Sequence, residues 1–308
     1  MKLATRLNSF LPQFDNDVEK VFENLETLGI NYVDLNYPEH TREISADEML
    51  KKLNKYNLHA NGVALRFRKD FINGEFGNHN VEISKKAVSL CKEAIDYCVK
   101  IGGEVVTIWL GFDGFDYSFQ LDYLKTWNQI KECFQEICDY NKNVKISIEY
   151  KPYEERSYAF LDSIGITGMM VRDINRENIG ITLDYCHMLM KHENPAFSVC
   201  LAAKDEKLYG IHLNDGYGVC DDGLMVGTSS LVKTIEFLYY VKYFNYDKAI
   251  YFDTFPTREE AVAECRQNIL MVKKLCNLID EIGMNEFKRV IELNDATEVS
   301  NLILKFLR

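Results

Sequence analysis

The chain lacks several features that define whole classes of protein. None of its apolar runs approaches the roughly 18 residues of a membrane-spanning helix, and residues 1–6 lack the charged-then-apolar layout of a secretory signal. Positive charge is scarce, because 36 Lys and Arg stand against 47 Asp and Glu, a net charge of −11. A phosphate backbone would be repelled by this balance. We therefore expect a cytoplasmic protein whose partners include neither a membrane nor a nucleic acid.

The nine cysteines form no Cys-x-x-Cys pair, which argues against a zinc ribbon and against a thioredoxin-like redox site. They are spread through a long chain, and most of them fall inside helical patterns. Cysteines placed in this way are typical of buried thiols in a reducing compartment.

No Pro-, Gly- or Ser-rich linker divides the chain, and no Gly-x-Gly-x-x-Gly turn follows an early strand, as a doubly wound sheet would require. Instead, short apolar runs alternate with longer segments of helical periodicity. Eight such strand–helix units are typical of the α/β class and of the (β/α)₈ TIM barrel. The predicted strands are residues 3–7, 32–35, 58–65, 104–110, 144–149, 179–183, 208–213 and 249–252.

Local signals mark some of the helix boundaries. Gly29 follows a predicted helix over residues 17–28, because glycine readily closes a helix in the left-handed conformation. Ser45, with Glu48 three residues later, has the pattern of a capping box. Further helices are predicted over residues 81–101, about 119–140, about 158–174 and about 257–282.

We divide the chain into a barrel of residues 1–284 and a C-terminal helical tail of residues 285–308. The tail has two short helical patterns that are too apolar for a solvated terminus. It either caps the barrel or a helix pair, or forms a contact between subunits. Its apolar residues are Phe287, Val290, Ile291, Val299, Leu302, Leu304, Phe306 and Leu307.

Charged side chains follow four of the predicted strands, at the end of the barrel where functional groups gather. The strand over 144–149 alternates apolar and polar residues and ends in Glu149, and Lys151 leaves on the same side two residues later. A lone Asp at such a place is commonly a helix cap, and a lone His a hydrogen-bonding residue. Four on consecutive strand ends instead predict a shared metal site, made of Glu149, Asp184, His212 and Asp253. Such an oxygen-rich set favours Mn²⁺ or Mg²⁺, with Co²⁺ or Zn²⁺ as substitutes.

Further candidates surround this set. His187 lies one helical turn beyond Asp184, on the same face. A loop with two glycines carries Asp221 and Asp222, which serve either turn formation or function; we predict Asp222 as a substrate contact. Trp109 precedes two glycines at the rim, and an indole face suits the C–H face of a sugar.

These segments together resemble the xylose-isomerase-like barrels, a superfamily of metal-dependent sugar isomerases and epimerases. The resemblance extends over more than half of the chain. It rests on Glu149-Tyr150-Lys151-Pro152, Asp184-Tyr185-Cys186-His187, His212-Leu213-Asn214-Asp215 with its trailing Asp-Asp-Gly-Leu, and the Trp109 stretch. It implies that Lys151 and His187 contact the oxygens of the substrate, and that the catalytic metal is bound by Glu149, Asp184, His212 and Asp253.

The chain departs from the family pattern in two places. Epimerases of this family usually carry Glu at the end of the eighth strand, as part of an acid/base pair, where this chain has Asp253. Aldose–ketose isomerases add an Asp-x-Asp pair for a second metal, where this chain has Asp221-Asp222-Gly223.

The loop and the Trp109 stretch are also similar to the alpha subunits of C-glycoside deglycosidases, which act on 3-keto C-glycosides with a small β-sandwich partner. We therefore expect a homo-oligomer, or a hetero-oligomer with a small all-β subunit.

The expected chemistry begins with removal of the proton alpha to the carbonyl of a metal-bound sugar. Glu149 and His187 are the candidate bases, and Lys151 is placed to polarise the carbonyl oxygen. Return of the proton gives an isomerase or an epimerase, whereas loss of a beta substituent gives a lyase; a metal-assisted hydride shift is a further route to isomerisation. An apurinic-site endonuclease would need more histidines and a positive face, and a sugar-binding module would not need four metal ligands.

Overall fold

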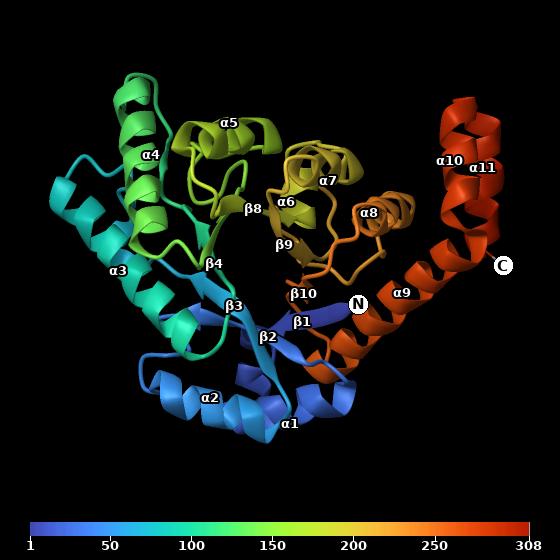
Figure 1. Cartoon of the computed structure of the whole chain (residues 1–308), viewed down its shortest axis with the longest axis horizontal. Coiled ribbons are helices and arrows are strands. Elements are labelled where there is room, and N and C mark those ends of the chain that lie inside the picture. Colours follow the sequence, from blue (N-terminus) through green and yellow to red (C-terminus); the bar gives the residue numbers. More distant parts are fainter. Residues whose placement is uncertain (308) are drawn as a thin grey trace.

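Eight parallel strands close into a barrel in the computed structural model, which describes residues 1–307 (Figure 1). Each strand lies within two residues of its predicted position, so the predicted TIM barrel is confirmed. Around the barrel the strands follow the order β1 (Lys2–Arg6), β10 (Ala249–Phe252), β9 (Leu208–Leu213), β8 (Ile179–Asp184), β6 (Lys145–Glu149), β4 (Val105–Trp109), β3 (His59–Leu65) and β2 (Tyr32–Tyr37).

Helices surround the barrel, and none among residues 1–307 is both long and apolar enough to cross a bilayer. The predicted boundaries hold at Gly29, which takes φ of 73° after the first helix, and at Ser45, whose side chain accepts the Glu48 N–H at 3.3 Å. The helices are α1 (Val18–Leu28), α2 (Ala46–Lys55), α3 (Val81–Lys100), α4 (Tyr123–Tyr140), α5 (Ile164–Ile174), α6 (Tyr185–Met190), α7 (Pro195–Ala203), α8 (Leu231–Tyr243), α9 (Ala261–Ile282), α10 (Met284–Leu293) and α11 (Ala296–Leu304).

Two predicted helices begin later than expected. Phe119 takes the left-handed conformation, with φ of 64°, so α4 cannot include it. That helix begins at Tyr123, after Asp122 caps it. The last barrel helix, predicted from about residue 257, begins at Ala261 because the Glu260 side chain caps its first N–H groups.

The predicted helix over about 158–174 is also shorter, because its first residues form a strand. β7 (Tyr158–Ala159) pairs antiparallel with β5 (Gly114–Phe115), and the Phe115 ring stacks on Tyr158 with centroids 5.1 Å apart. Ser163 then caps α5. This two-stranded sheet joins the loops that follow β4 and β6.

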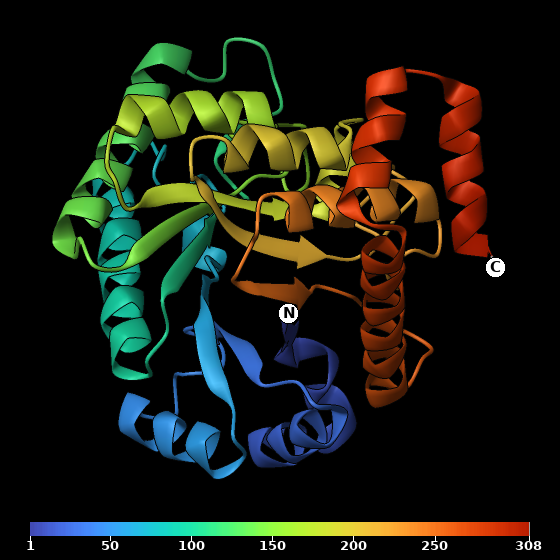
Figure 2. The same cartoon turned by 45° about the vertical axis from the view of Figure 1, so that its right-hand side comes forward.

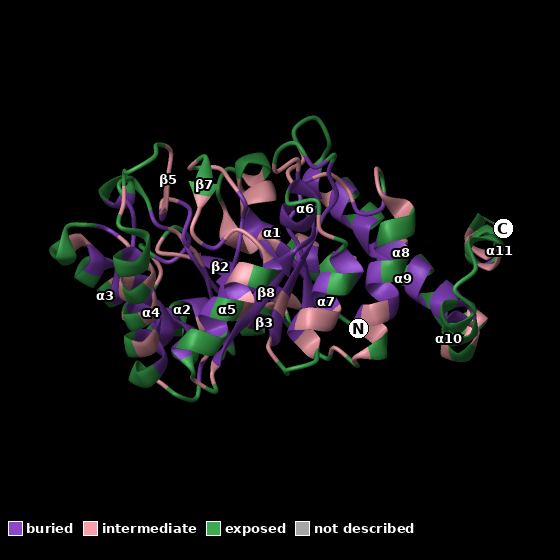
Figure 3. Cartoon of the chain, turned by 90° about the horizontal axis from the view of Figure 1, so that it is seen from above, coloured by how far each residue is buried: buried purple, intermediate pink, exposed green. Residues whose placement is uncertain are grey.

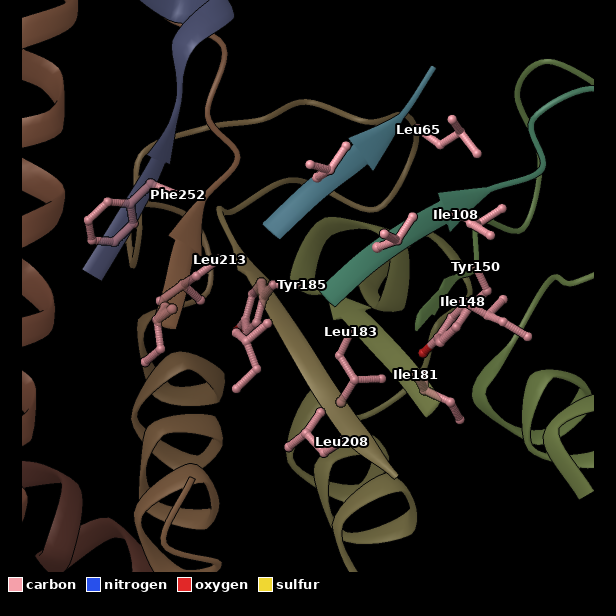
Figure 4. Packing of buried hydrophobic residues seen from close by; sticks show 14 of the residues in the cluster. Leu65, Ile108, Ile148, Tyr150, Ile181, Leu183, Tyr185, Leu208, Leu213 and Phe252 are labelled. Atoms are coloured by element: carbon pink, nitrogen blue, oxygen red, sulfur yellow. The ribbon is translucent and has the colours of Figure 1, made fainter. Parts of the chain in front are cut away.

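Side chains alternate between the two faces of the barrel wall. Apolar residues such as Ile148, Leu183 and Leu213 point outward into the layer between strands and helices (Figure 4). Ser147 and Thr182 point the other way, and their hydroxyls lie 2.6 Å apart. Buried residues accordingly concentrate on the strands and the inner faces of the helices (Figure 3). The next inward-facing positions along the strands are the charged strand ends.

The chain ends in a helical hairpin that projects away from the barrel, beyond α9 (Figures 1 and 2). A single residue, Gly283, separates α9 from α10. Phe287 of α10 stacks on Tyr239 of α8 with ring centroids 4.7 Å apart, which fixes the base of the hairpin. Leu302 of α11 is buried as well. Val290 of α10 is buried too, whereas Ile291, Leu293, Val299 and Leu304 are exposed.

Candidate metal centre

Four adjacent strands, β6, β8, β9 and β10, bring together the side chains predicted as metal ligands. Asp184 and His212 are register partners on β8 and β9, and Asp253 directly follows β10. One potential ligand atom from each of the four residues lies within 4.8 Å of the corresponding atoms of the other three. All four residues are buried, as listed: Glu149, Asp184, His212 and Asp253.

His212 lies between two carboxylates of this group. Its Nδ1 is 3.2 Å from Glu149 Oε1 and 3.9 Å from Asp253 Oδ2. Burial lowers the pKa of His212, but the carboxylates of Glu149, Asp253 and Asp184 outweigh it and raise the pKa to about 9. The group therefore favours a positive charge at its centre.

The carboxylates respond to burial and to one another. Burial and the acidic neighbours together raise the pKa of Asp184 to about 7, against the opposing charge of His187. Burial also tends to raise the pKa of Glu149, but His212 and His187 lower it to about 2. Like charges this close destabilise each other unless a cation offsets them.

The donor set fits a divalent cation. Three carboxylates and one imidazole converge, and no thiolate belongs to the group. Bound metal would replace the proton that the carboxylates otherwise favour on His212. The excess of hard oxygen donors suits Mn²⁺ or Mg²⁺ better than a metal that prefers sulfur.

Asn214 holds two of these residues in place, a role that its position after His212 alone did not indicate. Its side-chain amide donates to Asp184 Oδ2 at 3.2 Å and to the Asp253 backbone carbonyl at 3.0 Å. Its Oδ1 accepts the Cys186 N–H at 2.8 Å. Both hydrogen-bonding ends of this buried amide are therefore used to orient the β8 and β10 ends.

His187 and Lys151, predicted as substrate contacts, meet on one carboxylate oxygen. His187 Nδ1 is 2.9 Å from the Tyr150 carbonyl, which can only accept, so this nitrogen carries a proton. Its Nε2 lies 3.2 Å from Asp221 Oδ2, and Lys151 Nζ lies 3.1 Å from the same atom. Asp184, His187 and Asp221 form a second group of potential ligands beside the first.

Asp222, predicted as a substrate contact, makes its hydrogen bonds within its own loop. Its Oδ2 accepts the Tyr217 N–H at 2.7 Å, and its Oδ1 accepts from Cys220 Sγ at 3.1 Å. Asp222 thus stabilises its own loop, which is the turn chemistry that the sequence left open. Asp221, one residue earlier, is the carboxylate that reaches His187 and Lys151.

Trp109 lies at the rim next to Lys151, as predicted. The Lys151 ammonium is 5.3 Å from the centroid of the indole ring. A side chain at Gly111 would collide with this ring, because a Cβ there would lie 2.7 Å from Trp109 Cζ2. Gly111 therefore lets the indole lie flat along the loop.

Arg6, at the end of β1, is a site residue that the sequence did not indicate. Its Nη1 donates to Asp253 Oδ1 at 2.8 Å, and its guanidinium lies 4.5 Å from the Phe255 ring centroid. The parallel pairing of β1 with β10 brings the two strand ends level, although 247 residues separate them in the chain. Asp253 is therefore shared between the metal cluster and an arginine.

The chain belongs to the family of xylose isomerase-like TIM barrels, whose family model matches residues 22–275. Membership was expected from the segments around Glu149, Asp184, His212 and Trp109, and the match confirms it.

Among curated proteins, the chain is similar to the xylose isomerase of Thermus thermophilus, with 22% identity over 196 residues, 62% of this chain and 51% of that protein. The chain spans about half the length of the curated relatives it matches. Among solved structures, a D-allulose 3-epimerase from Methylomonas sp. has a TM-score of 0.75 at 16% identity and covers 89% of this chain and 98% of its own. The IOLI protein with a bound zinc atom has a TM-score of 0.70 at 16% identity and covers 90% and 98%. At these identities the structures demonstrate a common fold.

Proposed function

We propose that the chain is a divalent-metal-dependent enzyme of the sugar isomerase and epimerase type, which removes the proton alpha to the carbonyl of a keto- or aldo-sugar. The observation that carries this proposal is the convergence of Glu149, Asp184, His212 and Asp253 at the carboxyl ends of β6, β8, β9 and β10. Family membership supports it, as do the xylose isomerase and 3-epimerase activities named for similar proteins.

Each residue of the rim has a distinct part in this proposal. Glu149, Asp184, His212 and Asp253 would hold a divalent ion, Mn²⁺ in the first instance, which would supply Lewis-acid stabilisation of negative charge on the substrate. Glu149 accepts the alpha proton through a carboxylate oxygen. Lys151 and His187 donate to substrate oxygens, with Asp221 fixing both donors. Trp109 offers its indole face to the C–H face of the sugar.

The position of Arg6 bears on the stereochemical outcome. An epimerase needs acid/base groups on both faces of the reacting carbon, and Asp253 is the counterpart of Glu149 in this cluster. Arg6 occupies one oxygen of Asp253, and aspartate has a shorter reach than glutamate. This arrangement favours proton transfer by Glu149 on a single face, as in isomerisation, over two-base epimerisation.

Glu149→Gln tests the proposal directly. The Mn²⁺-loaded protein is incubated in D₂O with a ketose and aldose panel (D-fructose, D-allulose and D-xylose), and exchange of the alpha proton is followed by NMR. Removing the proton acceptor should slow exchange at least ~100-fold, the usual contribution of a general base. Glu155→Gln is the matched control, because Glu155 is an exposed residue of the neighbouring loop. Full exchange by Glu149→Gln with its metal content unchanged would remove Glu149 from the mechanism.

A second candidate function, carbon–carbon lyase in a C-glycoside deglycosidase, shares this first step. It is supported by the single-face arrangement around Asp253, because beta elimination needs no second base across the sugar. The Trp109 stretch and the Asp221-Asp222-Gly223 loop also fit it. In this case the chain acts as an alpha subunit on 3-keto C-glycosides. Cleavage of such a glycoside that depends on a co-purified small all-β protein would favour the lyase over the isomerase.

A further inference from the structure

A hollow of about 660 Å³ lies on the rim of the barrel, above the ends of β1, β2 and β3. Its charged and polar lining consists of Asn8, Asn16, Glu39, His40, Arg42, Glu43, Arg66 and Arg68, and Arg68 pairs with Glu39 at 2.9 Å. These residues follow the carboxyl ends of the three strands, so the hollow opens on the same face as the metal cluster. The function proposed above leaves it without a role.

Arg66 differs from the comparable arginines of the chain. Within residues 1–307, the other arginines that are not exposed pair with a carboxylate: Arg6 with Asp253, Arg156 with Asp116, and Arg176 with Asp139. Arg66 is also partly buried, but its guanidinium has no hydrogen bond or ion pair among those residues. A guanidinium that is held on the wall of a hollow and has no acceptor within the protein is suited to an oxyanion.

His40 adds a second donor to this hollow. Its Nδ1 accepts the Asn36 N–H at 3.1 Å, so the neutral ring carries its proton on Nε2. That Nε2 is buried without a hydrogen-bond partner, as are Thr41 Oγ1 and Asn36 Oδ1. Burial and the charges of Arg66 and Arg6 lower the pKa of His40 to about 4, against the opposing charge of Glu39, which keeps the ring neutral at pH 7.

The hollow and the metal cluster lie on neighbouring parts of the barrel rim. Asn8, two residues after Arg6, lines the hollow, and its Oδ1 accepts from the Asn36 side chain of β2 at 2.7 Å. Arg6 borders both sites, because its side chain pairs with Asp253 and its charge lowers the pKa of His40. A ligand that extends from the metal cluster past Arg6 would approach the hollow that Arg66 lines.

We propose that this hollow binds an anionic group at the end of the substrate distant from the reacting carbonyl, so that the substrate is an acidic sugar. This inference rests on the function proposed above. The shared chemistry is an oxyanion, supplied either by a phosphate ester or by a carboxylate. Arg66 provides the charge, and His40 Nε2–H and Arg42 complete the donor set. In a chain with a net charge of −11, such a local positive site is what allows an anion to approach.

The test measures anion binding by calorimetry, separately from catalysis. Inorganic phosphate and acetate are titrated into the full chain, as purified and again after chelation, so that binding to a metal is distinguished from binding to the hollow. We expect one saturable site for at least one of the two anions, and the preferred anion identifies the source of the charge. Arg66→Gln should weaken this binding at least tenfold, and Arg66→Lys should restore part of it.

Arg266→Gln is the matched control, since Arg266 is an exposed arginine of α9 with no part in either site. A circular dichroism melt establishes that each variant is folded. If Arg66→Gln does not fold, Arg66→Lys still tests the inference. Equal anion binding by wild type and both Arg66 variants would overturn the inference. It would also be overturned if an adventitious ion were the only anion bound. Equal affinities of the Mn²⁺-loaded chain for D-fructose, D-fructose 6-phosphate and D-glucuronate would overturn it too. If Glu149→Gln loses proton exchange and keeps anion binding, both proposals stand. If the chain binds no metal, the proposed function alone fails.

Discussion

Asp221 and Asp222 are neighbours in the sequence, yet their side chains have different surroundings. The Asp221 carboxylate reaches His187 and Lys151, whereas Asp222 bonds within its own loop. Gly223, with φ of 56°, helps to set the loop path that separates them. A difference of this kind depends on loop conformation, which is why the sequence could not distinguish the surroundings of the two carboxylates.

The pair offers a matched prediction. Asp221→Asn removes the one charge that Lys151 and His187 share, although Lys151 keeps its ion pair with Glu154 at 2.9 Å. We expect turnover to fall about 100-fold, as when a group orienting catalytic residues is lost. Asp222→Asn keeps an acceptor for the Tyr217 N–H and should remain within a few-fold of wild type. Steady-state kinetics on the same sugar measures both. Equal losses in the two variants would mean that the loop as a whole, and not Asp221, matters.

Some of the other site residues could be predicted from the sequence, and others could not. Glu149, Asp184, His212 and Asp253 were predictable because each ends an apolar strand, and the barrel topology makes consecutive strand ends neighbours. Arg6 was hidden, because its predicted strand continued through residue 7 and its partner Asp253 closes the barrel from the other end of the chain. Long-range pairs of this kind carry no local sequence signal.

Two buried acids join the loops that follow β3 and β4. Glu75 accepts the Phe112 N–H with both oxygens, at 3.0 and 3.1 Å, and Asp113 accepts the N–H groups of Glu75, Phe76 and Gly77. Burial raises the pKa of Asp113 to about 6, even though these N–H groups oppose the shift. Burial, with the Asp113 charge, also raises the pKa of Glu75 well above its ordinary range.

The raised pKa values predict how stability depends on pH. Between the ordinary acid values and about pH 6, the folded chain holds more protons than the unfolded chain, so these acids lower the free energy of unfolding as the pH rises. The free energy of unfolding falls by about 1.4 kcal/mol for each pH unit by which folding raises the pKa of one acid. In Glu75→Gln part of this pH dependence should disappear. Urea unfolding from pH 4.5 to 7.5 measures the slope, with Asp96→Asn on the surface as control; identical slopes in wild type and Glu75→Gln would contradict the prediction.

The elements were predictable from the sequence to different degrees. The barrel strands were predicted to within two residues because each is a short, mainly apolar segment that alternates regularly with longer helical patterns. Helix starts after long loops were missed, since Phe119 takes a left-handed turn and Tyr158 joins a two-residue strand. A strand that short has no periodicity, and its partner β5 lies on another loop.

At the scale of the whole molecule, the hairpin of α10 and α11 is the part least integrated with the barrel (Figure 2). Its base packs through Phe287 against Tyr239, while Ile291, Val299 and Leu304 are exposed. Apolar side chains exposed on adjoining helices are typical of surfaces that bind a partner. We propose that this surface mediates self-association of the chain, and that residues 1–284 form the folding unit.

Deletion of residues 285–308 tests both proposals together. The truncated chain should keep the circular dichroism spectrum of the barrel and its metal binding, but lose the few kcal/mol contributed by burying Phe287, Val290 and Leu302. Light scattering should find a smaller assembly than for the full chain. Failure of the truncated chain to fold would disprove the boundary, and an unchanged assembly would disprove the role of the hairpin.

The central claim concerns the whole barrel, because the four ligands come from four different strands and meet only when the sheet closes. Its most direct test is a calorimetric titration of Mn²⁺ into the chelated full chain. We expect at least one ion per chain, with an affinity reduced about 10- to 100-fold or more in Asp184→Asn and in His212→Gln. His192→Gln, which changes an exposed histidine, should bind as the wild type does. No binding by the wild type, or equal binding by all of these proteins, would contradict the account.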